Sequence, residues 1–98
     1  MREAVIVSTA RTPIGKAYRG SFNNTHAQTL AGHAISEAVK RAKVDPTDID
    51  DVILGAAAQQ GTQQGNIARQ SLLRAGLPTS VAGMLIDRQC ASGMMAIA

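Results

Sequence analysis

Aromatic residues are almost absent from the sequence. They make up 2% of the 98 residues, as Tyr18 and Phe22, and there is no tryptophan. A hydrophobic core must therefore be built from alanine, valine, isoleucine, leucine and methionine. Small apolar side chains of this kind suit helices that pack closely on a parallel sheet. Because proteins stack nucleic-acid bases on aromatic rings, this composition argues against a nucleic-acid partner.

Cysteine is equally scarce, since Cys90 is the only one. A single thiol excludes an internal disulfide and a multi-cysteine metal cluster. His26 and His33 lie outside the i, i+4 spacing of a helical metal pair, and no carboxylate cluster joins them. The P-loop, the G-x-G-x-x-G pattern and the G-x-S-x-G pattern are absent as well. We therefore expect no metal site and no nucleotide cofactor of these types.

The sequence also lacks a strong charge bias and a long hydrophobic run. Ten Lys+Arg against seven Asp+Glu give a net charge of +3, which is a mild excess. No apolar run approaches the roughly 20 residues of a membrane span, and no signal-peptide pattern precedes the first apolar run. We therefore expect one small domain in a reducing, cytoplasmic compartment, without a membrane partner.

The apolar patterning that is present predicts an α/β fold with the element order β-α-β-α-β. Short continuous apolar runs predict buried strands, and i, i+3, i+4 spacing predicts the helices between them. The predicted elements are a strand at 4–7, a helix at 27–42, a strand at 52–57, a helix at 67–75 and a strand at 82–86. This order favours a mostly parallel sheet with right-handed crossovers.

Capping residues mark the ends of the two predicted helices. Thr25 with Gln28 fits a capping box at the start of the first helix, and Pro46 stops the chain from continuing it. Asn66 can cap the second helix, which ends before Gly76. Both predicted helices therefore carry a start signal and a stop signal.

Cys90 occupies a position at which a thiol can become reactive. It follows the last predicted strand after a short polar stretch and opens the apolar segment 90–98, which is predicted to begin a buried helix. A thiol at a helix N-terminus faces free backbone N–H groups and the positive end of the dipole, which stabilise the thiolate. Small residues follow it and let a substrate or another backbone come close: Ala91, Ser92 and Gly93. The alternative interpretation is a buried structural cysteine.

The predicted elements do not complete a sheet of this type. A parallel sheet needs helices on both faces, and two helices with a truncated third cover three strands poorly. We therefore expect the fold to be incomplete and the chain to be the N-terminal part of a longer protein.

The segment around Cys90 reads Asp87-Arg88-Gln89-Cys90-Ala91-Ser92-Gly93-Met94-Met95-Ala96. It resembles the nucleophile motif of the thiolases, the acetyl-CoA acetyltransferases and 3-ketoacyl-CoA thiolases. Residues Val7 to Gly15 resemble the opening strand and loop of that family, and residues Gly65 to Gln70 resemble its glycine-asparagine helix start. Asp87 departs from the pattern, because the family usually has asparagine there, and this leaves the subfamily open.

The resemblance implies a thiolase-like layered fold, of which residues 1–98 would be the N-terminal part of the N-terminal domain. It also implies acyl transfer between a 3-ketoacyl-CoA and CoA, or condensation of two acetyl-CoA, through an acyl-cysteine at Cys90. The backbone N–H of Cys90 would then lie in an oxyanion hole. Acyl-CoA and CoA would be substrates, with no metal and no separate cofactor, and the full-length protein would form a homo-oligomer.

The same resemblance places further catalytic groups outside this chain. Thiolases use a histidine in a His-Pro-like motif and a second cysteine, both nearer the C-terminus, and His26 and His33 match neither motif. Two alternatives stay open: a non-catalytic structural fragment or dimerisation module of the same fold, and a ketoacyl synthase. The Arg-Gln-Cys-Ala-Ser-Gly string and the Arg-Thr-Pro opening favour a thiolase over a synthase.

Overall fold

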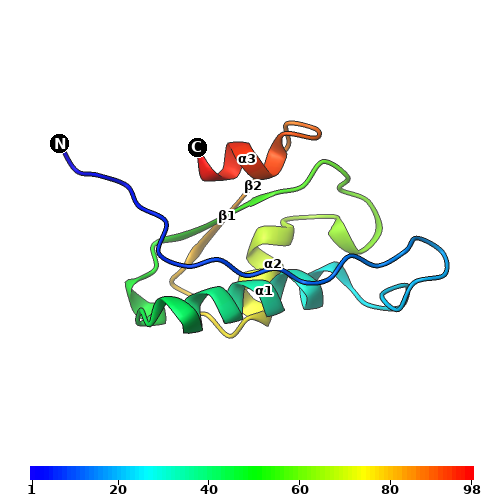
Figure 1. Cartoon of the computed structure of the whole chain (residues 1–98), viewed down its shortest axis with the longest axis horizontal. Helices are drawn as coiled ribbons and strands as arrows, with labels where there is room; N and C mark the ends of the chain where they lie inside the picture. Colours follow the sequence, from blue (N-terminus) through cyan, green and yellow to red (C-terminus); the bar gives the residue numbers. More distant parts are fainter.

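A computed structural model describes all residues from Met1 to Ala98. Strands β1 and β2 pair in parallel to form a two-stranded sheet, with Ile53 opposite Met84 (Figure 1). The predicted α/β class with a parallel sheet is therefore confirmed. The elements are α1 (Ala27–Ala42), the 3₁₀ helix η1 (Pro46–Asp48), β1 (Asp51–Gly55), the 3₁₀ helix η2 (Gly61–Gln63), α2 (Ile67–Arg74), β2 (Ala82–Ile86) and α3 (Ser92–Ile97).

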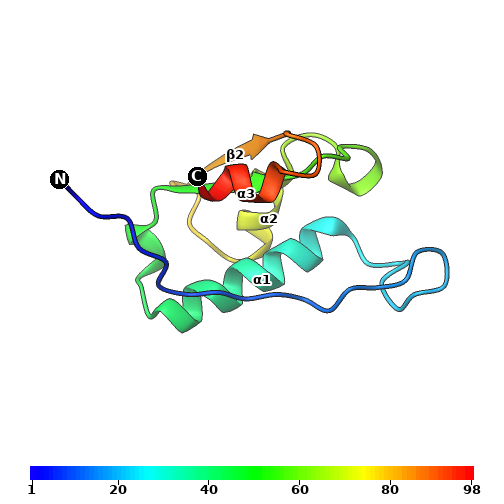
Figure 2. The same cartoon turned by 45° about the horizontal axis from the view of Figure 1, so that its top comes forward.

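Helices cover both faces of this sheet, and two glycines permit their close approach. A Cβ at Gly83 would lie 2.8 Å from the backbone nitrogen of Arg69 in α2, and one at Gly55 would lie 2.3 Å from backbone atoms of Ser92 in α3. Gly83 pairs with Val52, which lies three positions before Gly55 in β1. Successive residues of a strand point to opposite faces, so Val52 and Gly55 point in opposite directions. The two glycines therefore face opposite sides of the sheet. Helix α2 therefore packs on one face and α3 on the other, while α1 packs on α2 (Figure 2).

The core lies between α1, α2 and the sheet, and it is small. Eight of the 98 residues are buried, and the central cluster consists of Leu72, Leu77 and Val81. Ile35 and Val39 of α1 pack against this cluster. Helix α2 and the loop after it therefore supply all three residues of the central cluster.

The cap predicted for α2 is confirmed. The Asn66 side-chain oxygen accepts a hydrogen bond from the backbone N–H of Arg69 at 3.0 Å, and its amide nitrogen donates to the Gly83 carbonyl at 2.8 Å. The positive φ of 85° at Gly76 ends the helix region as the sequence predicts. The same side chain thus starts α2 and ties it to β2.

The capping box predicted for α1 is wrong. The N-cap is His26, whose side chain makes no capping hydrogen bond. The first helical N–H, that of Ala27, donates instead to the Thr62 hydroxyl at 3.2 Å, and the Gln28 side chain donates to Gln70 in α2. Tertiary partners therefore replace the local ones that a capping box would supply.

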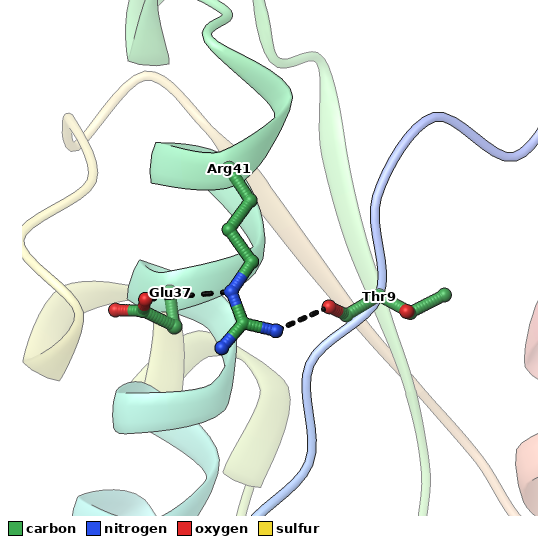
Figure 3. Close-up of polar contacts among 3 residues, drawn as sticks. All are labelled: Thr9, Glu37 and Arg41. Atoms are coloured by element: carbon green, nitrogen blue, oxygen red, sulfur yellow. Dashed lines mark hydrogen bonds and ion pairs between the residues drawn. The ribbon is translucent and has the colours of Figure 1, made fainter.

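The predicted strand at 4–7 does not form. Val5 and Ile6 are 74% exposed and Val7 is 69% exposed. Beyond this run the extended chain passes alongside α1 in both views (Figures 1 and 2). Its carbonyl at Thr9 accepts a hydrogen bond of 2.9 Å from Arg41, which also pairs with Glu37 (Figure 3). An extended run needs a backbone neighbour to become a strand, and the sheet of these residues contains only β1 and β2.

The bounds of α1 and β2 are as predicted, and those of β1 and α2 differ from prediction by one or two residues. Strand β1 starts at Asp51 and ends at Gly55, and α2 ends at Arg74. The chain has no helix with the length and apolar content that crossing a bilayer requires.

Candidate functional site

Cys90 lies on a tight turn between β2 and α3. Helix α3 begins at Ser92, so Cys90 precedes the helix rather than opening it as predicted. The thiol is free and exposed. The alternative of a buried structural cysteine is therefore wrong for this chain.

The backbone of the turn explains why the helix begins late. Gln89 has a φ of 50°, in the left-handed region, which interrupts any helix that would include it. The N–H of Ala91 donates to the Arg88 carbonyl at 3.1 Å, and the N–H of Ser92 donates to the Gln89 carbonyl at 3.1 Å. A non-glycine residue in this conformation costs about 1–3 kcal/mol and persists only where its surroundings fix it. The turn is therefore a constrained element.

Two side chains supply that constraint. The Ser92 hydroxyl accepts a hydrogen bond from the Arg88 N–H at 2.8 Å and donates to the Gln89 carbonyl at 2.6 Å. The Asp87 carboxylate accepts from the Gln89 N–H at 2.9 Å. Both backbone polar groups of Gln89 are thus engaged by side chains of the same short segment.

Asp87, the residue that departs from the thiolase pattern, is bonded to the turn and not to the thiol. Its carboxylate makes hydrogen bonds to Gln89 only. Asp87 forms no ion pair with Arg88, and the one ion pair of the chain joins Glu37 to Arg41. The Arg88 guanidinium instead lies 3.9 Å from the Met95 sulfur. A side-chain oxygen at this position is the feature that the turn uses, and an asparagine offers one as well.

Backbone N–H groups near the thiol are left without acceptors. Neither the N–H of Cys90 nor those of Gly93 and Met94 donate to any group of the chain. The latter two belong to the first turn of α3, where N–H groups have no intrahelical partner. An exposed thiol and backbone N–H groups without acceptors are therefore neighbours in the sequence.

The structure brings neither histidine into hydrogen-bond contact with Cys90. His26 and His33 belong to α1 and its N-cap. No group of three or more His, Cys, Asp or Glu side chains gathers as a set of metal ligands. An open hollow of about 290 Å³ lies beside the turn, bordered by Arg88, Ala91, Met94, Met95 and Ala98, but Cys90 does not line it.

The second motif segment, Gly65 to Gln70, supports the Cys90 turn through the sheet. Its Arg69 guanidinium donates to the carbonyls of Val81 at 2.5 Å and Thr79 at 3.1 Å, directly before β2. With the Asn66 bond to Gly83, these contacts fix the strand whose C-terminal end leads into the turn. This segment therefore has a structural role within the described residues.

Reasoning from the sequence misses Gly55 and the turn-closing hydrogen bonds of Ser92. Gly55 admits the backbone of Ser92 and Gly93 against β1, and Ser92 closes the turn. The small residues after Cys90 correctly indicate the close approach of another backbone, but which backbone approaches depends on tertiary structure. A serine four residues after Arg88, at a helix start, is the one local signal for the closing hydrogen bond.

The sequence of this chain is similar to that of known proteins. Residues 4–98 match the family described as "Thiolase, N-terminal domain". The chain is 43% identical over 98 residues to a 3-ketoacyl-CoA thiolase of Aliivibrio fischeri, covering 99% of this chain and 25% of that protein. It is 46% identical to a 3-oxoadipyl-CoA/3-oxo-5,6-dehydrosuberyl-CoA thiolase of Escherichia coli, covering 99% and 24%. It is 42% identical to an acetyl-CoA acetyltransferase of the same organism, covering 100% and 24%.

The chain thus spans about a quarter of the length of these relatives. The family match covers nearly all of it, including β1, α2, β2 and the turn that carries Cys90. The resemblance first indicated by the Cys90 segment is therefore established over residues 4–98. This chain belongs to the thiolase family, whose named members here are enzymes that act on acyl-CoA.

Proposed function

We propose that Cys90 is the nucleophile of a thiolase-type acyl transfer, carried out by the complete protein to which this segment belongs. The observation that carries the proposal is the exposed thiol on a constrained strand-to-helix turn, beside unpaired N–H donors. Its support from outside the structure is the family match, which includes this turn.

In the degradative direction, the Cys90 sulfur attacks the C3 carbonyl of a 3-ketoacyl-CoA. The bond between C2 and C3 breaks, its electron pair stays on C2, and a proton added there releases acetyl-CoA. The thiol of a second CoA then attacks the acyl-cysteine, which yields a shortened acyl-CoA and regenerates the Cys90 thiol. The N–H of Cys90 is suited to stabilise the negative charge that develops on the carbonyl oxygen. The reverse sequence is a Claisen condensation of an acyl-CoA with acetyl-CoA, and it joins two acetyl-CoA when the product is acetoacetyl-CoA.

We propose further properties of the complete enzyme by analogy with the family. Residues 1–98 form the N-terminal part of a thiolase N-terminal domain, and the complete protein supplies the proton-transferring groups and the CoA-binding loops. It works in the cytoplasm on intermediates of fatty acid metabolism and assembles as a homo-oligomer. Four apolar side chains of the sheet and α3 are exposed in this chain: Ile53, Met84, Met94 and Ile97. Their exposure supports the proposal that other residues of the complete protein cover this surface.

Trapping the acyl-enzyme tests this proposal directly. The product of the complete reading frame is incubated with acetoacetyl-CoA without free CoA, quenched in acid and digested, and the peptide that contains Cys90 is weighed by mass spectrometry. We expect this peptide to gain one acetyl group, and we expect acetoacetyl-CoA cleavage to fall by several orders of magnitude in Cys90→Ala. Acetylation at another residue, or equal turnover in the wild type and Cys90→Ala, would contradict the proposal.

A second candidate is a non-catalytic structural fragment or dimerisation module of the same fold. The exposed apolar side chains named above favour it for the 98-residue chain alone. We expect this chain by itself to show no measurable thiolase activity, because an unassisted thiol lacks the base and the CoA site. Cleavage of acetoacetyl-CoA by the purified chain, well above its Cys90→Ala variant, would show that His26 or His33 performs a role assigned here to the rest of the enzyme.

A further inference from the structure

Ser92 is the one buried side chain in the segment that presents Cys90. It is 3% exposed, whereas every residue from Asp87 to Ala91 is exposed. Its hydroxyl uses both a lone pair and its proton, accepting from the Arg88 N–H and donating to the Gln89 carbonyl. Ser71 offers a contrast within the same chain, since its hydroxyl is equally buried but has no hydrogen-bond partner.

We propose that Ser92 is a positioning residue that fixes the orientation of Cys90 by closing the turn before it; this proposal rests on the proposed role of Cys90 as the nucleophile. The hydroxyl bridges the residues on either side of the Arg88–Gln89 peptide bond. It thereby holds Gln89 in its left-handed conformation, and this conformation determines the direction of the next residue, Cys90.

The rest of the fold makes this bridge rigid. Helix α3 rests on β1 at Gly55, where a Cβ would come within 2.3 Å of backbone atoms of Ser92. The Ser92 backbone therefore cannot move toward the sheet. On the opposite side of the turn, Asp87 holds the N–H of Gln89. Ser92 links the sheet to the turn, so the position of Cys90 is set relative to β1 and β2.

Ser92 does not itself touch the reacting atoms. Its proton is donated to the Gln89 carbonyl, and the side chain is closed to solvent. Its effect must therefore come through the geometry of Cys90 and its N–H. Because misplacement of a catalytic group by about 1 Å can cost about 100-fold in rate, a loosened turn should reduce kcat while leaving substrate binding in place.

The test uses the product of the complete reading frame and compares Ser92→Ala with Ser71→Ala. Both variants remove one buried hydroxyl, but only Ser92→Ala removes hydrogen bonds. In Ser92→Ala we expect kcat for acetoacetyl-CoA cleavage to fall about 100-fold with KM within about twofold of the wild type. Hydrogen exchange of the Arg88 amide should become at least about tenfold faster, while amides of α2 keep their protection. Ser71→Ala should leave kcat, KM and the exchange rate of the Arg88 amide unchanged.

A second pair separates the hydroxyl from the volume of the side chain and serves if Ser92→Ala does not fold. Threonine and valine have nearly the same shape and differ in the hydroxyl, so Ser92→Thr should retain kcat within about tenfold and Ser92→Val should lose about 100-fold. Equal kcat in these two variants, or unchanged Arg88 exchange in Ser92→Ala, would overturn the positioning role. If instead the wild type forms no acyl-cysteine, the proposed function fails, and the Arg88 exchange still decides whether Ser92 closes the turn.

Discussion

Two apolar runs of similar composition reach different states in this chain. Val52 to Leu54 form the middle of β1, which pairs with β2 and lies between α2 and α3. Val5 to Val7 are extended but unpaired, and most of their surface is exposed. Local β-propensity is thus equal in the two segments, and the presence of a pairing strand and covering helices separates them. An apolar, β-branched run therefore becomes a strand only where a second strand is available to pair with it.

The largest expected effect comes from making the same substitution in the buried core, at Ile67 of α2, and in the exposed N-terminal run, at Ile6. Ile67 is 2% exposed and Ile6 is 74% exposed. Ile67→Ala should lower the free energy of unfolding by about 2–5 kcal/mol, because it removes buried side-chain volume from the start of α2. Ile6→Ala should change it by less than about 0.5 kcal/mol. Urea unfolding followed by far-ultraviolet circular dichroism measures both.

The two variants also have a clear contrary outcome. A comparable loss in Ile6→Ala would mean that the N-terminal segment packs in solution and that its exposed state is wrong. Since eight of the 98 residues are buried, Ile67→Ala removes a large share of the core, and a chain that no longer folds would also agree with the prediction.

A smaller effect is expected at the contact between β1 and α3. An added Cβ at Gly55 would lie 2.3 Å from Ser92, whereas one at Gly93 would meet nothing within 4 Å. Gly55→Ala should therefore cost about 1–3 kcal/mol by overpacking. Gly93→Ala should be neutral or stabilise the chain by about 1 kcal/mol, since alanine is the better helix former.

The same pair of glycine variants reports on the Cys90 turn. If Gly55 anchors α3, hydrogen exchange of the amides in residues 88–92 should accelerate in Gly55→Ala and stay unchanged in Gly93→Ala. Equal stability of the two variants would show that α3 does not rest on β1, and the layered arrangement on that face of the sheet would then be incorrect.

Much of the fold could be predicted from the sequence because local signals and tertiary contacts agree there. The Asn66 cap, the extent of β2 and the spacing of apolar residues in α1 all follow from nearby residues. The missing strand at 4–7 and the unused capping box could not be predicted, because each depends on groups distant in the chain. Within the site, Cys90 is visible from its motif, but the role of Ser92 depends on a left-handed Gln89 that no pattern indicates.

The N-caps of the two long helices provide a third comparison. Asn66 makes a capping hydrogen bond and a second bond to β2, whereas His26 makes no capping bond. Asn66→Ala should lower the free energy of unfolding by about 0.5–2 kcal/mol, and His26→Ala should be close to neutral. Thermal unfolding of both variants under the same conditions measures the difference. An equal loss in both would show that tertiary contacts, and not the cap, determine where α2 begins.

The smallest effect lies at the entry to β1, a feature that the N-terminal run lacks. The backbone N–H of Thr47 and then its hydroxyl donate to the Asp45 carboxylate, and these hydrogen bonds lower the pKa of Asp45 below its ordinary value. A lowered pKa in the folded state contributes stability above the unfolded-state pKa, about 3.9, and this contribution is lost as the pH falls through the folded-state pKa. The carboxylate is fully exposed, so the effect on stability is expected to be the least of the four.

Carboxyl titration by NMR should give a midpoint for Asp45 below the ordinary value. Thr47→Val, which removes the hydroxyl and keeps the N–H, should move that midpoint part of the way back, and Thr47→Ser should leave it in place. An unchanged midpoint in Thr47→Val would show that the hydroxyl takes no part, leaving the backbone N–H as the sole donor at the turn that leads into the sheet.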